Sequence, residues 1–228
     1  MDNKPSNESP RIRHSDTRIL ALTTLICLAS AIYGLIQLDS MLDSFYIFNP
    51  PDLHNLSLQA ISLHGTNTSG IVSHIVASLH QDPKLSPYLS VSEEWIFNNA
   101  GGAMGAMYIL HASVTEYLII FGTALGTEGH TGRHTADDYF HILSGTQYAY
   151  APGPGVFEPE VYPAGSVHYL RRGEVKQYSM REACFALEYA RGWIPGMLAF
   201  GTLDFWTLWR TTWVTGREMV GNLLVGKM

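Results

Sequence analysis

The sequence predicts a mainly β domain with helices at both ends, built as a small barrel or sandwich behind a membrane anchor. Three observations lead to this fold class. An uncharged apolar run occupies residues 19–37, short apolar segments separated by turn residues lie between residues 139 and 189, and residues 204–224 have the apolar spacing of a helix. Several short strands at close spacing are typical of small β-barrels and sandwiches.

Composition narrows the possible functions. The chain has 228 residues, which suits one domain with extensions, and it carries a net charge of −6 with only 15% charged residues. An acidic, charge-poor chain lacks the clustered Lys and Arg that bind a phosphate backbone, so we expect no nucleic-acid partner. Its two cysteines exclude a disulfide-dense scaffold, and Cys27 in the apolar run is not expected to pair with Cys184.

The apolar run at residues 19–37 is long enough to cross a bilayer as a helix, because a rise of 1.5 Å per residue spans a hydrocarbon core of about 30 Å. Three basic residues precede it: Arg11, Arg13 and Arg18. The first basic residue after it is Lys84. We therefore expect residues 1–18 to form a cytoplasmic tail, residues 19–38 a single transmembrane signal anchor, and the rest of the chain to lie on the far side. A cleaved signal peptide is the alternative, which the length of the run disfavours.

Residues 39–92 are expected to be a helical connector. Apolar residues recur at spacings of three and four in residues 57–64 and 70–80, and the sequence GTNTSG separates the two segments. Two glycosylation sequons fall here, Asn55-Leu56-Ser57 and Asn67-Thr68-Ser69, and they matter only if this side of the membrane is lumenal.

A second apolar run covers residues 103–125 and predicts a buried helix followed by a strand. A second membrane span is the alternative. His111 and Glu116 lie inside the run, and a charge at the centre of a bilayer costs several kcal/mol. Gly105 and Gly122 also weaken a helix there. We therefore place the run in the core of the protein.

The later part of the chain alternates between strand and helix signals. Residues 166–180 predict two short strands around Arg172-Gly173, and residues 184–192 predict another. In the tail, Trp209 and Trp213 belong to an apolar helical face suited to a membrane interface, although packing on the barrel is an alternative for the same helix.

Ionisable residues within the apolar strands are candidates for proton transfer. Glu188 lies in FALEYA, and if its side chain points into the barrel, burial raises its pKa. A solvent-facing Glu paired with Arg191 is an equally good interpretation of the spacing. Asp137 and Asp138 enter another strand, where adjacent residues point to opposite faces, so at most one faces inward. Two such carboxyls meeting in an apolar cavity would form an acid–base pair.

Metal and nucleotide sites are less well supported. His130 and His134 are four residues apart, but GHTGRH contains two glycines and predicts a turn rather than a metal-binding helix face. We expect no metal and no cofactor. The glycines of residues 98–107 match neither common phosphate-loop pattern, so they indicate close backbone packing.

Residues 93–147 strongly resemble the fungal sterol C-8 isomerases, which share a family with the sigma non-opioid intracellular receptor. The resemblance continues through KQYSM, FALEYARGWIP and LDFWTLWRT, and so covers nearly all of residues 93–224. GTEGHTG at residues 126–132 and ADDYF at residues 136–140 are typical of the isomerase branch. The receptor branch has an acid at the position of Phe140 and an apolar residue at that of Asp138.

The resemblance implies a cupin-like β-barrel with an N-terminal transmembrane helix, C-terminal membrane-associated helices and trimeric packing. The barrel, a ligand-binding domain, would span residues 93–200, and residues 201–228 would form amphipathic helices at the membrane interface. Glu188 matches the family's buried carboxylate that meets cationic amines, and Asp138 faces the same pocket. The implied substrate-binding residues line its walls: Met107, Ile109, Tyr117, Phe121 and Leu198.

One departure from the family falls between Phe200 and Asp204. There the chain is shorter than its relatives by roughly two helical turns, in a segment that helps to form the membrane-side helices and the route into the pocket.

These features predict a sterol isomerase of ergosterol biosynthesis that moves the ring double bond from carbon 8 to carbon 7. Glu188 and Asp138 are the expected catalytic residues, supported by His111 and Asp137. We also expect the protein to be a homotrimer in the endoplasmic reticulum membrane, with its barrel in the lumen and in contact with the bilayer. We expect hydrophobic amines to inhibit the enzyme. The rivals are a non-enzymatic sigma-type receptor or chaperone and a metal-dependent barrel enzyme.

Overall fold

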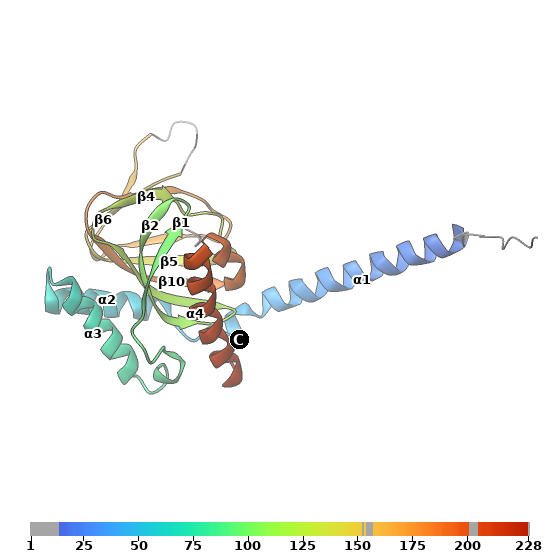
Figure 1. Cartoon of the computed structure of the whole chain (residues 1–228), viewed down its shortest axis with the longest axis horizontal. Helices are drawn as coiled ribbons and strands as arrows, with labels where there is room; N and C mark the ends of the chain where they lie inside the picture. Colours follow the sequence, from blue (N-terminus) through green and yellow to red (C-terminus); the bar gives the residue numbers. More distant parts are fainter. Residues whose placement is uncertain (1–13, 152, 154–156, 201–204, 228) are drawn as a thin grey trace, which may run out of the picture. The chain divides into compact units, whose positions relative to one another are not determined.

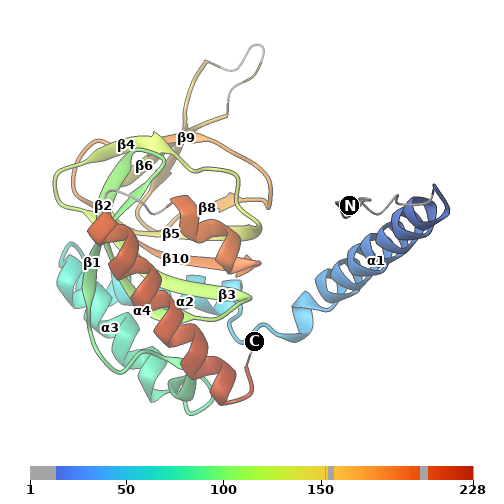
Figure 2. The ribbon, with the colours of Figure 1, turned by 45° about the vertical axis from the view of Figure 1, so that its right-hand side comes forward.

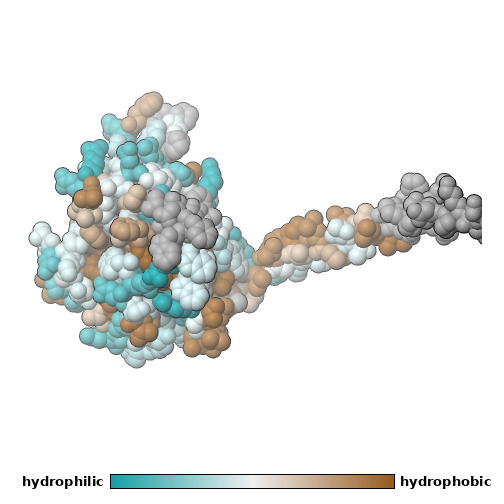
Figure 3. Space-filling view, viewed as in Figure 1, coloured by the Kyte–Doolittle hydropathy of each residue, from teal (hydrophilic) through white to brown (hydrophobic). Residues whose placement is uncertain are grey.

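The computed structural model describes residues 14–151, 153, 157–200 and 205–227, and it divides the chain into two units at residue 44. The first unit contains helix α1 (His14–Ser40) and a short 3₁₀ turn, η1 (Leu42–Ser44). Among the described residues, Ile19–Ser40 is the helical segment long and apolar enough to cross a membrane. Figure 3 shows hydrophobic side chains along most of α1. The hydroxyls of Thr23 and Thr24 donate to carbonyls one turn earlier, so these polar groups are satisfied within the helix.

The second unit, residues 45–228, is built on two antiparallel sheets that face each other. The larger sheet has the strand order β1 (Trp95–Ala100), β2 (Ala103–Ala112), β3 (Glu116–Thr123), β10 (Cys184–Gly192), β5 (Ala136–Ser144) and β8 (Val167–Leu170). The smaller has the order β4 (Thr127–His130), β9 (Gln177–Met180), β6 (Thr146–Tyr150) and β7 (Glu160–Pro163). Figure 1 shows the strands of both sheets together in the barrel. Apolar side chains from the two sheets form one buried cluster. The structure therefore confirms the mainly β fold class, and the strands predicted in residues 166–180 and 184–192 are present.

Helices α2 (Pro50–His64) and α3 (Thr68–Gln81) cover the outer face of the larger sheet. Their apolar residues, including Leu53, Ile71 and Ile75, pack on Leu118 and Leu187. The structure thus confirms the helices that were predicted in the connector. A short 3₁₀ turn, η2 (Ser86–Tyr88), leads from α3 towards β1. The larger sheet is consequently buried on both faces.

The predicted helix at the start of residues 103–125 is wrong: the run forms two paired strands, β2 and β3. Both faces of these strands are buried, so apolar residues occupy successive positions and the alternation typical of a half-exposed strand is absent. The glycines have a packing reason. A Cβ added at Gly105 would lie 2.7 Å from the Gly122 carbonyl oxygen on the neighbouring strand.

The chain ends in a 3₁₀ segment, η3 (Ile194–Phe200), and helix α4 (Phe205–Leu224), which confirms the helical tail. Figure 2 shows α4 lying across β1 and β2. One face of α4 is buried against the barrel and consists of Thr211, Val214, Thr215, Met219 and Asn222. The opposite face exposes Trp209, Trp213, Val220, Leu223 and Leu224. The buried face confirms that the tail packs on the barrel, and the membrane-interface interpretation of the exposed apolar face stays a prediction.

Candidate functional site

Two carboxylic acids face the interior of the barrel from neighbouring strands. Glu188 on β10 is opposite Phe140 of β5, and Asp138 on β5 is opposite Ala190 of β10. The two acids are therefore diagonal neighbours on one face of an antiparallel pair, a relation in which Cα atoms lie about 7–8 Å apart and long side chains meet. Of the two adjacent acids, Asp138 is the one that faces inward. Its carboxyl is buried, and its Oδ1 has no hydrogen-bond partner among the described residues.

Burial is the main cause of the raised pKa values of these two carboxyls. It raises the pKa of Glu188 to about 7. Burial also raises the pKa of Asp138 well above its ordinary value, and the nearby charge of Glu188 adds to the effect. An apolar surrounding disfavours the charged form of each acid, and two negative charges so close disfavour each other. The pair therefore holds protons near neutral pH, as a proton donor to carbon must.

Two cavities lie beside Glu188, and the first of them also contains Asp138. The first is lined by Phe121, Thr131, Asp138, Phe140, Gln147, His168, Leu170 and Tyr178, and the second by Met107, Tyr117, Ile119, Ile194, Met197, Leu198 and Thr211. Both are also lined by Asn98, His134 and Glu188. The two cavities are therefore adjacent, and their walls are mainly apolar. Such walls suit a flat hydrocarbon ligand, with the two carboxyls as its polar feature.

The expected substrate-binding residues lie in this region of the barrel. Met107, Tyr117 and Leu198 line the second cavity and Phe121 lines the first, while Ile109 packs in the interior core. Tyr117 also reaches helix α4, because its hydroxyl lies 3.2 Å from the Thr215 hydroxyl. This contact connects the cavity wall to the helix with the exposed apolar face.

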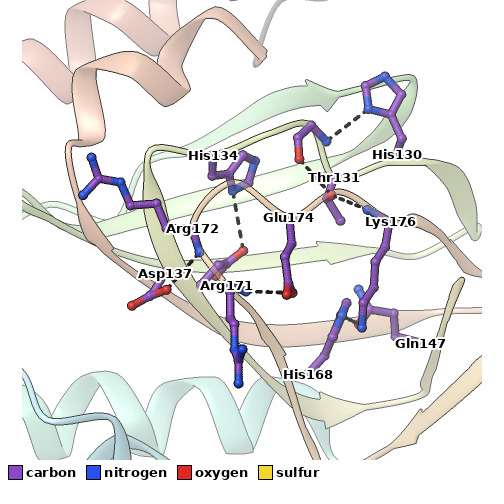
Figure 4. A network of polar contacts seen from close by, with 12 residues as sticks. His130, Thr131, His134, Asp137, Gln147, His168, Arg171, Arg172, Glu174 and Lys176 are labelled. Atoms are coloured by element: carbon purple, nitrogen blue, oxygen red, sulfur yellow. Dashed lines mark hydrogen bonds and ion pairs between the residues drawn. The ribbon is translucent and has the colours of Figure 1, made fainter. Parts of the chain in front are cut away.

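The first cavity extends towards a polar cluster in the barrel. The side chain of Gln147 meets that of His168, with Oε1 and Nδ1 2.8 Å apart (Figure 4). The Tyr162 ring stacks on His168, with the ring centroids 4.5 Å apart. Burial lowers the pKa of His168 to about 4. The imidazole is therefore neutral at physiological pH and provides a hydrogen-bonding end to an otherwise apolar cavity.

Several cavity residues were missed by the sequence analysis. Asn98 lies on β1, Tyr178 on β9, and His134 in the loop before β5. The pKa of Tyr178 is raised by burial and then by the charges of Glu188 and Asp138, so its phenol faces the pair. His134 is four residues before Asp138, but it lies in a loop, where the alternation of a strand does not apply, so the sequence offered no signal that it faces the cavities.

Asp137 does not join the pair. Its Oδ1 accepts a hydrogen bond of 2.9 Å from the Arg172 backbone nitrogen on the outer side of the sheet (Figure 4). Arg191, the alternative partner for Glu188, is also on that side, where it donates to the Tyr139 hydroxyl at 3.1 Å. Asp137 points to the opposite face of the sheet from Asp138, because successive residues of a strand point to opposite faces. Its support of the pair stays a prediction. Its charge acts at longer range and adds to the raised pKa of Asp138.

His111 is likewise on the outer face. The β2–β3 register shifts between Ile109 and His111, and the bulge turns His111 towards Phe48 under the helical connector. Its Nδ1 lies 2.7 Å from the Tyr88 carbonyl oxygen, and burial lowers its pKa to about 4. His111 therefore packs against Phe48 on the outer face, and its support of the pair stays a prediction.

Glu116 is a third buried acid with a different role. Both of its carboxylate oxygens accept from the Ile47 nitrogen at 2.8 Å, and Oε1 also accepts from the Phe48 nitrogen at 3.0 Å and the Tyr189 hydroxyl at 2.8 Å. These bonds attach the segment before α2 to the outer face of the sheet. Unlike the carboxyls in the cavities, this one is fully engaged.

The predicted shortening between Phe200 and Asp204 falls on residues 201–204, which lie outside the described residues. The described residues Met197 and Leu198, directly before it, line the second cavity.

Several known proteins are similar to this chain in sequence. A family model described as "ERG2 and Sigma1 receptor like protein" matches residues 23–227. A C-8 sterol isomerase of Pyricularia oryzae is 69% identical over 83% of this chain and 88% of its own. The C-8 sterol isomerase ERG2 of Gibberella zeae is 60% identical over 99% and 96%. A sigma non-opioid intracellular receptor 1 of Xenopus tropicalis is 33% identical over 77% and 80%.

Among solved structures, an RmlC-like cupin from Shewanella frigidimarina matches with a TM-score of 0.37 and 13% identity, over 46% of this chain and 89% of its own. A cupin superfamily protein from Desulfitobacterium hafniense matches with a TM-score of 0.33 and 13% identity, over 37% and 74%.

Proposed function

The chain belongs to the family of ERG2 and Sigma1 receptor like proteins, and we propose that it isomerises sterols at carbon 8 with the buried carboxyls Glu188 and Asp138. The activity is that of its fungal relatives at 60 to 69% identity, which favours an isomerase over a sigma-type receptor. The observation that carries the proposed chemistry is the meeting of two buried carboxyls in an apolar barrel.

The reaction consists of two proton transfers to and from carbon. A proton adds to carbon 9 of the double bond, carbon 8 becomes a cation, and loss of a proton from carbon 7 forms the new double bond. The first step needs an acid, the second needs a base, and the cation between them is stabilised by nearby negative charge. A pair that holds one proton and one negative charge meets all three needs. Hydrophobic amines would inhibit because an ammonium group resembles the cation.

Complementation tests the function. In a fungal strain that lacks its C-8 sterol isomerase, this chain is expected to restore ergosterol and remove the accumulated 8-unsaturated sterols, as sterol extraction and mass spectrometry measure. A chain that is well expressed and still leaves those sterols unchanged contradicts the proposal.

The pH profile of kcat/KM is expected to rise with pH up to about 7. Below that pH both carboxyls of the free enzyme are protonated, and no base is present for the departing proton. As the pH passes the raised pKa of Glu188, about 7, Glu188 ionises while Asp138, whose pKa is raised by burial and by the charge of Glu188, keeps its proton. The expected slope is tenfold per pH unit on the acidic side. Initial rates measured from pH 5 to 8 check it, and a flat profile contradicts it.

We place the enzyme in the endoplasmic reticulum membrane with its N-terminus in the cytoplasm and the barrel in the lumen. The basic residues before the anchor support this orientation, and the exposed indoles of Trp209 and Trp213, which stack at 6.2 Å, suit the interface of the same bilayer. A sterol entering from the bilayer would meet the α4 side of the barrel.

Native sequons on both sides of the anchor test this orientation. Asn7-Glu8-Ser9 precedes it, and Asn67-Thr68-Ser69 lies in the exposed segment where α3 begins. The side-chain Oδ1 of Asn67 accepts from the Gly70 nitrogen at 3.1 Å, and glycosylation at Nδ2 leaves that bond intact. The sequon at Asn55 is poorer, because the Ser57 hydroxyl is buried and donates to the Leu53 carbonyl at 2.8 Å.

We expect microsomal protein to show a glycosidase-sensitive mobility shift that Asn67→Gln removes. Asn7→Gln is the control and is expected to leave the shift in place, since the tail is cytoplasmic. A shift that depends on Asn7 reverses the orientation.

We further propose a homotrimer. Strand β1 is at the edge of the larger sheet, and around it lies an exposed apolar patch formed by Trp95, Phe97, Met104 and Leu125. An apolar patch beside an edge strand is a liability in a monomer and is suited to a second copy of the chain. Sedimentation of the detergent-solubilised enzyme measures the number of copies.

A further inference from the structure

After the proposed isomerisation, the two carboxyls of the enzyme are in the wrong protonation states for the next turnover. The acid has given its proton to carbon 9, and the base has taken a proton from carbon 7. The sterol has gained and lost one proton, so the enzyme as a whole is unchanged. Before another sterol can react, one proton must travel from the carboxyl that was the base to the carboxyl that was the acid.

We propose that His134 carries this proton between Asp138 and Glu188 and so resets the pair after each turnover, an inference that rests on the proposed function. The step balances without any other reactant. An imidazole nitrogen takes the proton as the O–H bond of one carboxylic acid breaks, the imidazolium forms briefly, and an N–H bond then breaks as the other carboxylate takes the proton.

The position of His134 carries the inference. Its Nδ1 lies 4.0 Å from Oδ2 of Asp138, and each of the two side chains is only 10% exposed. His134 also lines both cavities, and Glu188 does the same. The imidazole is thus next to the Asp138 carboxyl and lines the same two cavities as Glu188. A dashed line in Figure 4 marks this interaction of His134.

The acidity of His134 suits a group that holds a proton only briefly. Burial lowers its pKa, and a hydrogen bond with the Thr131 backbone acts in the opposite direction. The resting imidazole is neutral and can accept a proton, whereas its cation is disfavoured by burial and gives the proton up again.

The amide and phenol side chains beside the pair lack this ability. Asn98 lines both cavities, but an amide does not carry a proton at neutral pH. The phenols of Tyr117 and Tyr178 have pKa values raised by burial, so they remain protonated and serve as hydrogen-bond donors. His168 lines the first cavity with Asp138, and its Nδ1 is occupied by Gln147.

Comparing the rate of the first turnover with the steady-state rate distinguishes a role of His134 in the reset from other roles. In His134→Gln we expect the first turnover, measured by rapid quench, to keep its rate within twofold, because the pair starts correctly protonated. The steady-state rate is expected to fall at least tenfold, because the reset becomes slow. The time course then shows a burst of about one product per active site. His130→Gln is the matched control: His130 is exposed, lies at the end of β4 four residues before His134, and its replacement is expected to leave both phases unchanged.

Each outcome decides the proposal. Equal losses in the first turnover and the steady state overturn it, since they indicate a positioning or folding role. Unchanged rates overturn it as well, since solvent or direct exchange then resets the pair. If His134→Gln does not fold, His134→Ala takes its place, and added imidazole is expected to restore the steady-state rate; failure of that rescue in a folded variant counts against the proposal. Glu188→Gln tests the proposed function separately, because this variant is expected to lose the first turnover, whereas His134→Gln is expected to keep it.

Discussion

Replacing Glu188 by Gln is expected to lower kcat by at least about 10³-fold while the protein remains folded. Gln keeps the shape of the side chain and cannot exchange a proton, and positioned acid–base groups contribute about 10²–10⁴-fold to such reactions. Folding is expected to be unaffected because burial raises the pKa of Glu188 to about 7, which shows that the folded state gains nothing from the charged form. Product formation with purified enzyme and thermal unfolding are the two measurements.

Asp138→Asn is expected to cost a similar factor, and the double variant no more than either single one, because the two carboxyls act as a unit. The chain offers a matched control in Asp137→Asn, the same substitution one residue earlier on the same strand. Asp137 faces outward to the Arg172 backbone, so kcat is expected to change by about twofold or less. Retention of a tenth or more of kcat by Glu188→Gln rules out its assignment as a proton-transfer residue.

Replacing Glu116 by Ala is expected to have the opposite profile, lowering the free energy of unfolding by about 4 kcal/mol with little effect on kcat of the folded enzyme. The substitution removes the acceptor for the backbone nitrogens of Ile47 and Phe48 and for the Tyr189 hydroxyl. Each buried donor left without a partner costs about 1–3 kcal/mol. The activity is spared because Glu116 faces the outer side of the sheet.

Denaturant unfolding in detergent measures this effect. Glu116→Gln is expected to lose less than Glu116→Ala, since its amide oxygen still accepts, and Glu128→Ala on the exposed strand β4 is expected to change stability by about 0.5 kcal/mol or less. A Glu116→Ala variant as stable as the parent contradicts the structural role. Together, Glu188 and Glu116 separate a buried acid kept for chemistry from one kept for folding.

Part of this protein follows from local sequence alone. The length and lack of charge of residues 19–37 are sufficient to predict a membrane-spanning helix, and the spacing of Trp209 and Trp213 is sufficient to predict an amphipathic one. Glu188 stands out for the same reason, because a charge in an apolar strand is conspicuous without any knowledge of its neighbours. The rule of alternation also required that only one of Asp137 and Asp138 face inward.

Only the tertiary structure decided the rest. Residues 103–112 form a strand rather than a helix because the sheet is buried on both faces, which removes the polar alternation that marks a strand in the sequence. His111 faces outward because of a bulge in the β2–β3 register, and His134 joins the carboxyls from a loop. The composition and periodicity of a segment show which of its side chains must be buried. Strand pairing and register decide which side chains come into contact, and the proximity of Glu188, Asp138 and His134 depends on that pairing and register.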